Sequence, residues 1–166
     1  MRSAFILLLL SLSFSLFSQS NFAKELKEIL NDSSNHFQKF RGTLKEMQDA
    51  ESSYYNSTIT LEGTKKNWVS THRSVCSYHA DIADSVTKNR GKKILDEWKI
   101  NLVSILGAGY KIEQSKRKWD SEFVDGWTFT KGNFSVFIML SQYFYDKSLC
   151  GVSLFIGHEH PTPKSS

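Results

Sequence analysis

The sequence has a small net charge, no long apolar run after residue 20 and no recognisable catalytic motif. Its formal net charge of +4 is too small for this length to indicate nucleic-acid binding. Beyond residue 20 no segment approaches eighteen consecutive apolar residues, so we expect no transmembrane segment in the mature chain. These absences favour a soluble protein that has no nucleic-acid partner.

Catalytic and metal-binding motifs are also scarce. There is no G-x-S-x-G elbow and no familiar Ser-Asp-His spacing, which speaks against nucleophilic catalysis. The one pointer to a metal is "HEH" at 158–160, beside Pro161 and without a third ligand. We interpret these histidines as solvated tail residues, and we expect no metal and no other cofactor.

The first twenty residues have the layout of a cleaved secretory signal. Arg2 supplies the early positive charge, residues 5–10 are apolar, and Ser18 and Ser20 supply small residues at the end. Cleavage before residue 19 and cleavage before residue 21 both fit the pattern. The sequence therefore predicts a secreted or periplasmic protein with a signal peptide at 1–20.

The remaining chain is one domain's worth of sequence. The whole sequence is 40% hydrophobic and 13% aromatic, which speaks against disorder and allows a real core. Both prolines fall in the last residues of the chain, so we expect a disordered tail at 158–166. The prediction is a single globular domain at 21–157.

Two helices are predicted from apolar residues at helical spacing. The first is short and carries Phe22, Leu26, Ile29 and Leu30. The second has a longer apolar stripe and is closed by glycines at 107 and 109. Its stripe consists of Ile94, Leu95, Trp98, Leu102, Ile105 and Leu106. Its start is open between residues 81 and 89, because Gly91 and a basic cluster fit poorly in a first turn.

Most of the other segments are typical of strands. Alternation of apolar and polar residues, aromatic content and a Gly132-Asn133 turn between two runs are the signals. The run 134–140 is apolar on both sides, which predicts a strand covered on both faces. The expected strand regions are 37–44, 54–63, 67–80, the two arms of the 132–133 hairpin, and the segment after residue 148.

These elements predict an α+β fold in which two main helices pack on a largely antiparallel sheet. The phrase "HRSVC" at 72–76 is echoed by "DKSLC" at 146–150, with the cysteines 74 residues apart. This echo suggests two duplicated halves, each a helix followed by strands. Coincidence explains so short a match equally well.

The two cysteines are predicted to face the core. Cys76 shares a strand face with Tyr78 and Ala80, and Cys150 shares one with Val152 and Leu154. In an oxidising compartment they could pair, and a loop of this size would stabilise the fold by roughly 4 kcal/mol. The alternative is two buried free thiols.

Two basic stretches run into tryptophans, "KKNW" at 65–68 and "KRKW" at 116–119. If Trp68 and Trp119 are exposed beside Lys66 and Lys118, they could hold a sugar ring, an anionic polymer or a membrane surface. The alternative is that each tryptophan anchors the start of a strand while the lysines solvate the preceding turn.

The pattern favours a secreted, non-catalytic binding or interaction module with an unknown protein or glycan partner. One alternative is a small hydrolase or metal-dependent enzyme that uses His72 and His79. The other is a carrier of a small apolar ligand between helix and sheet, which requires a cavity at Trp98, Leu102, Val136 and Ile138.

Overall fold

The computed structural model describes residues 21–47, 51–119, 122–143 and 145–158, apart from the side chains at 116–119, 122–124 and 158. Residues 21–31 form the first helix, and the second is α2 (Lys88–Leu106). Two short 3-10 turns, η1 (Ser33–Asn35) and η2 (Gln38–Phe40), follow the first helix. The strands are β1 (Arg41–Met47), β2 (Ser52–Ser57), β3 (Lys66–His72), β4 (Val75–Thr87), β5 (Lys111–Trp119), β6 (Glu122–Lys131), β7 (Phe134–Gln142) and β8 (Leu149–His158).

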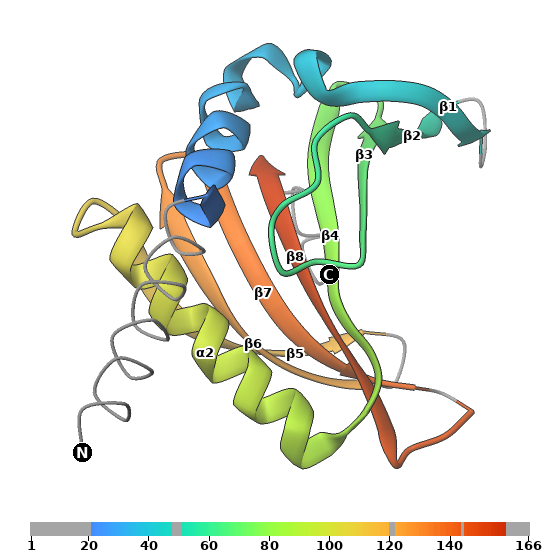
Figure 1. The fold of residues 1–166 in the computed structure, drawn as a ribbon, viewed down its shortest axis with the longest axis vertical. Helices are drawn as coiled ribbons and strands as arrows, with labels where there is room; N and C mark the ends of the chain where they lie inside the picture. Colours follow the sequence, from blue (N-terminus) through green and yellow to red (C-terminus); the bar gives the residue numbers. More distant parts are fainter. Residues whose placement is uncertain (1–20, 48–50, 120–121, 144, 159–166) are drawn as a thin grey trace, which may run out of the picture.

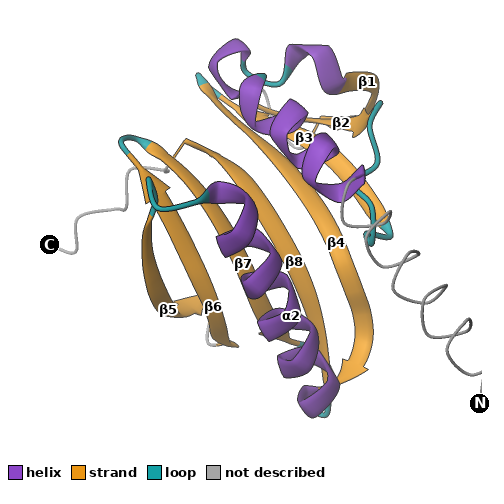
Figure 2. Cartoon of the chain, turned by 60° about the vertical axis from the view of Figure 1, so that its left-hand side comes forward, coloured by secondary structure: helices purple, strands orange, loops and turns teal. Residues whose placement is uncertain are grey.

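The eight strands form one antiparallel sheet in the order β1-β2-β3-β4-β8-β7-β6-β5. Both helices lie on the same side of this sheet, as Figures 1 and 2 show. The predicted α+β fold, two helices on an antiparallel sheet, is therefore confirmed. Each half of the chain places a helix before four strands, and the two groups of strands meet where β4 pairs with β8. Duplication as the origin of this arrangement stays a prediction.

The core lies between the helices and the sheet. Along β8 the alternate residues Val152, Leu154 and Ile156 are fully or almost fully buried, as a strand with one face against helices requires. The neighbouring strand β7 contributes Val136 and Ile138 to the same layer. The residues between them, such as Phe137 and Phe155, point to the face opposite the helices. On β7 one residue of that face, Met139, is also buried.

The second helix begins at Lys88, directly after β4, which resolves the start that the sequence left open. Gly91 is buried in its first turn, and a Cβ there would lie 2.5 Å from Cδ1 of Leu140 on β7. A larger residue here would have to displace the end of the Leu140 side chain, because the helix lies so close to the sheet. At the other end Gly107 has φ 72°, and its N–H donates to the carbonyl of Val103.

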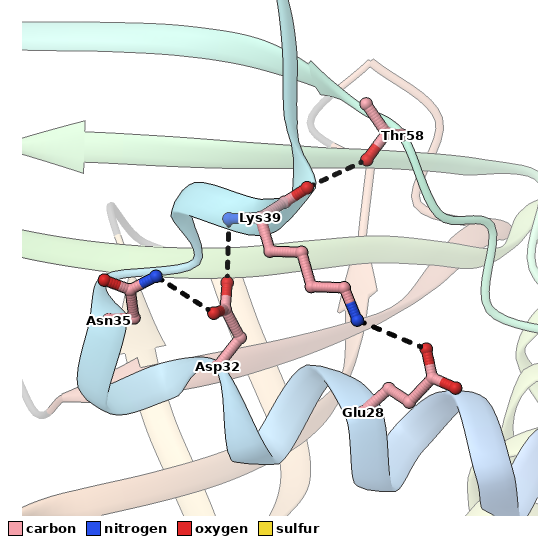
Figure 3. Close-up of polar contacts among 5 residues, drawn as sticks. All are labelled: Glu28, Asp32, Asn35, Lys39 and Thr58. Atoms are coloured by element: carbon pink, nitrogen blue, oxygen red, sulfur yellow. Dashed lines mark hydrogen bonds and ion pairs between the residues drawn. The ribbon is translucent and has the colours of Figure 1, made fainter.

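The connection from the first helix to β1 is held by polar side chains (Figure 3). The carboxylate of Asp32 accepts hydrogen bonds from the Lys39 N–H at 3.0 Å and from Asn35 Nδ2 at 3.2 Å. Between them, His36 and Phe37 have φ of 56° and 55°, a left-handed conformation that is unfavourable for bulky residues. Phe37 is nevertheless fully buried, so core packing and the Asp32 contacts together hold this turn.

Cys76 and Cys150 do not form the disulfide that the sequence left open as one of two possibilities. Each cysteine is the second residue of the last strand in its half, but β4 and β8 run antiparallel, so the two lie at opposite ends of the pair. Cys150 stands opposite Val86, ten residues along β4 from Cys76, which is roughly 30 Å at the usual rise per residue. A disulfide needs Cα atoms within about 7 Å. Both cysteines are free and buried, as the alternative had it.

Two local expectations from the sequence are corrected. The region 37–44 was expected as a strand, but Gln38–Phe40 is a 3-10 turn and β1 starts at Arg41. The basic residues before Trp119 were interpreted as a turn that leads into a strand, but Lys111–Trp119 is itself a strand that Trp119 ends. The Gly132-Asn133 hairpin between β6 and β7 is confirmed, with Gly132 at φ 60°.

Candidate functional site

The sheet face opposite the helices carries a row of aromatic side chains. Trp68 on β3 stands directly opposite His79 on β4, His79 opposite Phe155 on β8, and Phe155 opposite Phe137 on β7. These four residues, the aromatic row, cross the middle of the sheet at one level. All four are half-buried, so part of each ring is accessible to solvent.

Each ring of the aromatic row contacts the next ring of the row, which lies on the adjacent strand. The Trp68 and His79 rings stack, with centroids 5.1 Å apart and planes 11° apart. The ring of Phe155 meets His79 edge-on at 4.7 Å and Phe137 in a tilted contact at 6.2 Å. Such cross-strand aromatic pairs stabilise a sheet, and they also fix the orientation of the exposed ring edges.

One end of the aromatic row opens into a groove of about 320 Å³ lined by Lys45, Glu46, Tyr54 and Trp68. Tyr54 stands opposite Ser70 on β3, so it is the diagonal neighbour of Trp68 on the same face. Tyr54 and Trp68 therefore supply two aromatic walls. We call this site the Trp68 groove.

A bulge in β1 explains how two consecutive residues line the same groove. The register shifts between Leu44, which stands opposite Tyr55, and Glu46, which stands opposite Tyr54. Lys45 is the extra residue at this irregularity. In a regular strand Lys45 and Glu46 would point to opposite faces, but the bulge allows both side chains to lie on the groove side. Within the part of the chain that the structure describes, neither Lys45 nor Glu46 joins an ion pair.

The two histidines of the enzyme alternative each share a hydrogen bond with a serine. Nδ1 of His72 lies 2.7 Å from Oγ of Ser52, and Nε2 of His79 lies 2.6 Å from Oγ of Ser70. His72 is four residues along β3 from the partner of His79, a separation of roughly 13 Å. The two imidazoles share the helix-free face but do not converge on one pocket.

The cysteines are poor candidates for nucleophiles. Burial raises the pKa of Cys76, and Arg41, whose Nη2 lies 3.2 Å from Sγ, opposes this only in part. Burial likewise raises the pKa of Cys150 against the nearby charge of Lys88. A thiol with a raised pKa carries little thiolate at neutral pH, and the thiolate is the reactive form.

Of the residues proposed from the sequence as ligand-binding, the structure places Trp68 in the groove. Lys66 is exposed, begins β3 and shares the face of Trp68 by alternation, although Lys45 and not Lys66 lines the groove. The side chains of Lys118 and Trp119 lie outside the described residues. The sequence reasoning therefore found one groove residue and missed the others.

The groove residues that sequence reasoning missed come from β1 and β2. The bulge in β1 breaks the alternation, so the sequence does not indicate to which face Lys45 and Glu46 belong. For Phe137 and Phe155 a signal existed, because both alternate with residues expected in the core.

The remaining sequence hypotheses gain no site. Leu102, Val136 and Ile138, which the carrier alternative assigned to a cavity wall, are fully buried members of the core, and Trp98 packs against them. No group of three metal-binding side chains occurs in the described part of the chain. Within "HEH", His158 ends β8, and Glu159 and His160 lie outside the described residues.

No helix among the described residues is both long and apolar enough to cross a membrane. The predicted signal at 1–20 lies outside these residues. Comparisons with protein-family models, with curated proteins and with solved structures gave no match.

Proposed function

We propose that this chain is a secreted, non-catalytic binding module whose ligand surface is the helix-free face of the sheet. Secretion is supported by the signal-like layout of residues 1–20. The observation that carries the binding proposal is the aromatic row, four rings in contact across the middle of a face that none of the described helices covers.

The solvated face of an antiparallel sheet ordinarily carries polar residues. On β4 and β8 the flanking positions on this face follow that rule, with Ser77, Asp81 and Ser153 beside the aromatic row, whereas on β7 the flanking residue Met139 is apolar. A half-exposed aromatic centre within a polar surround resembles the anatomy of a binding surface, where aromatic residues are enriched and the rim is polar. Clustered aromatic side chains that are partly accessible mark interaction sites more often than isolated side chains do.

The experiment is a ligand selection followed by substitution. The protein produced from the full sequence is screened against a displayed peptide library and a glycan array, and each ligand is measured again on Phe155→Ala. A matched control is Ile100→Ala, because Ile100 is 67% exposed on α2. Binding that requires Phe155 and not Ile100 supports the proposal. Ligands that bind both variants like the unmodified protein contradict it.

One observation favours a second candidate function, a hydrolase. The hydrogen bond between Ser70 and His79 places a hydroxyl within reach of an imidazole, which is the geometry of a nucleophile and its base. The test is hydrolysis of p-nitrophenyl acetate and butyrate by the protein and by Ser70→Ala. Turnover that disappears in Ser70→Ala but persists in Ser77→Ala would establish this candidate in place of the binding module.

A further inference from the structure

The Trp68 groove has a chemistry that narrows the ligand of the proposed binding module. We propose that it holds one or two rings of an uncharged oligosaccharide, an inference that rests on the proposed function. Its walls are two aromatic side chains, and its rim carries one ammonium and one carboxylate group. A pyranose presents an apolar C–H face and a ring of hydroxyls, and these are the two kinds of surface that such walls and such a rim can bind.

The aromatic walls provide the apolar contact. Trp68 has one ring face against His79, and it also lines the groove together with Tyr54. The stack on His79 fixes the tryptophan ring before any ligand arrives, so little side-chain freedom is lost on binding. Aromatic side chains combine a large apolar area with few rotatable bonds, which makes them efficient platforms for a flat ligand face.

The charged rim provides complementary hydrogen bonding. The ammonium of Lys45 only donates and the carboxylate of Glu46 only accepts, whereas a sugar hydroxyl can do both. Hydrogen bonds to charged groups are stronger than those between neutral groups. Neither side chain has an ion-pair partner among the described residues that it would have to leave before it contacts a ligand.

The same pair of charges argues against other ligands. Glu46 repels a polyanion and Lys45 repels a cation, so a ligand without net charge fits the groove best. The groove volume of about 320 Å³ compares with roughly 150 Å³ for a cavity that encloses one benzene, which corresponds to one or two rings.

The test uses defined neutral oligosaccharides as probes. Hexamers of β-1,4-glucose, β-1,4-N-acetylglucosamine, β-1,4-xylose, β-1,4-mannose and α-1,4-glucose are each titrated to millimolar concentration and followed by saturation-transfer NMR and tryptophan fluorescence. Polygalacturonate serves as the charged comparison. The expected result is binding of at least one neutral hexamer and weaker binding of the polyanion.

Substitutions then locate the site. Trp68→Ala is expected to weaken binding of that hexamer by about tenfold, because it removes the main stacking surface. Glu46→Gln keeps the shape of the rim and removes its charge, and we expect a loss of about threefold to tenfold. The matched control for Tyr54→Ala is Tyr145→Ala, because Tyr145 is 97% exposed and does not line the groove. Circular dichroism checks that each variant is folded.

The outcomes separate this inference from the proposed function. If no neutral hexamer binds at millimolar concentration, or if the bound hexamer is unaffected by Trp68→Ala, the oligosaccharide inference is overturned. A selected peptide that requires Phe155 would in that case leave the binding module standing with a protein partner. If neither oligosaccharide nor peptide depends on any residue of the aromatic row, both proposals fail.

Discussion

The buried hydroxyl of Tyr78 allows a prediction about stability, because both its removal and its ionisation change the free energy of unfolding by an amount that can be calculated. Tyr78 is fully buried, and its hydroxyl donates to Oδ1 of Asn67 at 2.6 Å. The carbonyl oxygen of Ile59 lies farther from this hydroxyl, at 3.3 Å, and it also accepts from Oγ of Ser57 at 2.7 Å. The Asn67 oxygen also accepts from the N–H of Leu61 at 3.3 Å, so it keeps a donor when the tyrosine hydroxyl is lost. We therefore expect Tyr78→Phe to lower the free energy of unfolding at pH 7 by about 1–1.5 kcal/mol, the net value of one hydrogen bond without an orphaned partner.

This loss should depend on pH, with a definite sign. Burial raises the pKa of Tyr78 above its ordinary value of 10.0, because the charged phenolate is disfavoured away from water. A group whose pKa is higher in the folded state stabilises the fold below the unfolded pKa, and this stability is lost as pH rises above it. At pH 11 the unfolded chain has largely ionised while the folded chain has not, which costs the unmodified protein about 1.4 kcal/mol.

Tyr78→Phe lacks this ionisation, so its deficit should shrink from about 1–1.5 kcal/mol at pH 7 to near zero at pH 11. Urea unfolding followed by tryptophan fluorescence at pH 7, 9 and 11 measures this difference. The control is Tyr145→Phe, whose side chain is almost fully exposed. A deficit of Tyr78→Phe that stays the same at pH 7 and pH 11 would refute the reasoning, as would a control that behaves like Tyr78→Phe.

Three further outcomes follow from the fold. Asp32→Ala should lower the free energy of unfolding by about 1–2 kcal/mol in urea titrations, because the turn into β1 loses two accepted hydrogen bonds, and unchanged stability would contradict that role. Gly126→Ala should cost about 2 kcal/mol or more, since its Cβ would meet the carbonyl oxygen of Ile138 in the neighbouring strand, and a thermal melt that matches the unmodified protein would show that this contact is relaxed. A thiol titration of denatured, unreduced protein should find two free thiols per chain, and a count of zero would show that the disulfide forms. The native protein should react slowly with iodoacetamide, because burial raises the pKa of Cys76 and Cys150.

The architecture was predictable where burial follows a regular period. The helical stripe of α2 and the alternation of Val152, Leu154 and Ile156 identified elements and core together, and both are confirmed by burial. The charged segment 111–119 gave a weak signal, because an edge strand has neighbours on one side and so needs few apolar residues.

The candidate site was only partly predictable because it depends on contacts between strands. Trp68 could be selected because a basic stretch runs into it, but its stacking on His79 depends on the register of β3 against β4. Lys45 and Glu46 reach the groove through a bulge, which no local pattern reveals. The choice between a disulfide and two free thiols could not be made from the sequence for the same reason, because the two cysteines lie at opposite ends of the antiparallel pair of β4 and β8.

The two edge strands of the sheet are poorly suited to binding a partner by the addition of a further strand. β1 and β5 are the edge strands. The pairing of β1 with β2 has two irregularities within seven residues, and Lys45 and Glu46 are charged. β5 has five charged residues among nine. Charges and bulges on edge strands discourage the addition of a further strand by backbone pairing. Because backbone pairing at the edges is disfavoured, the proposed recognition of a partner would depend on side chains. The half-buried rings of the aromatic row lie together on the face that the described helices leave open.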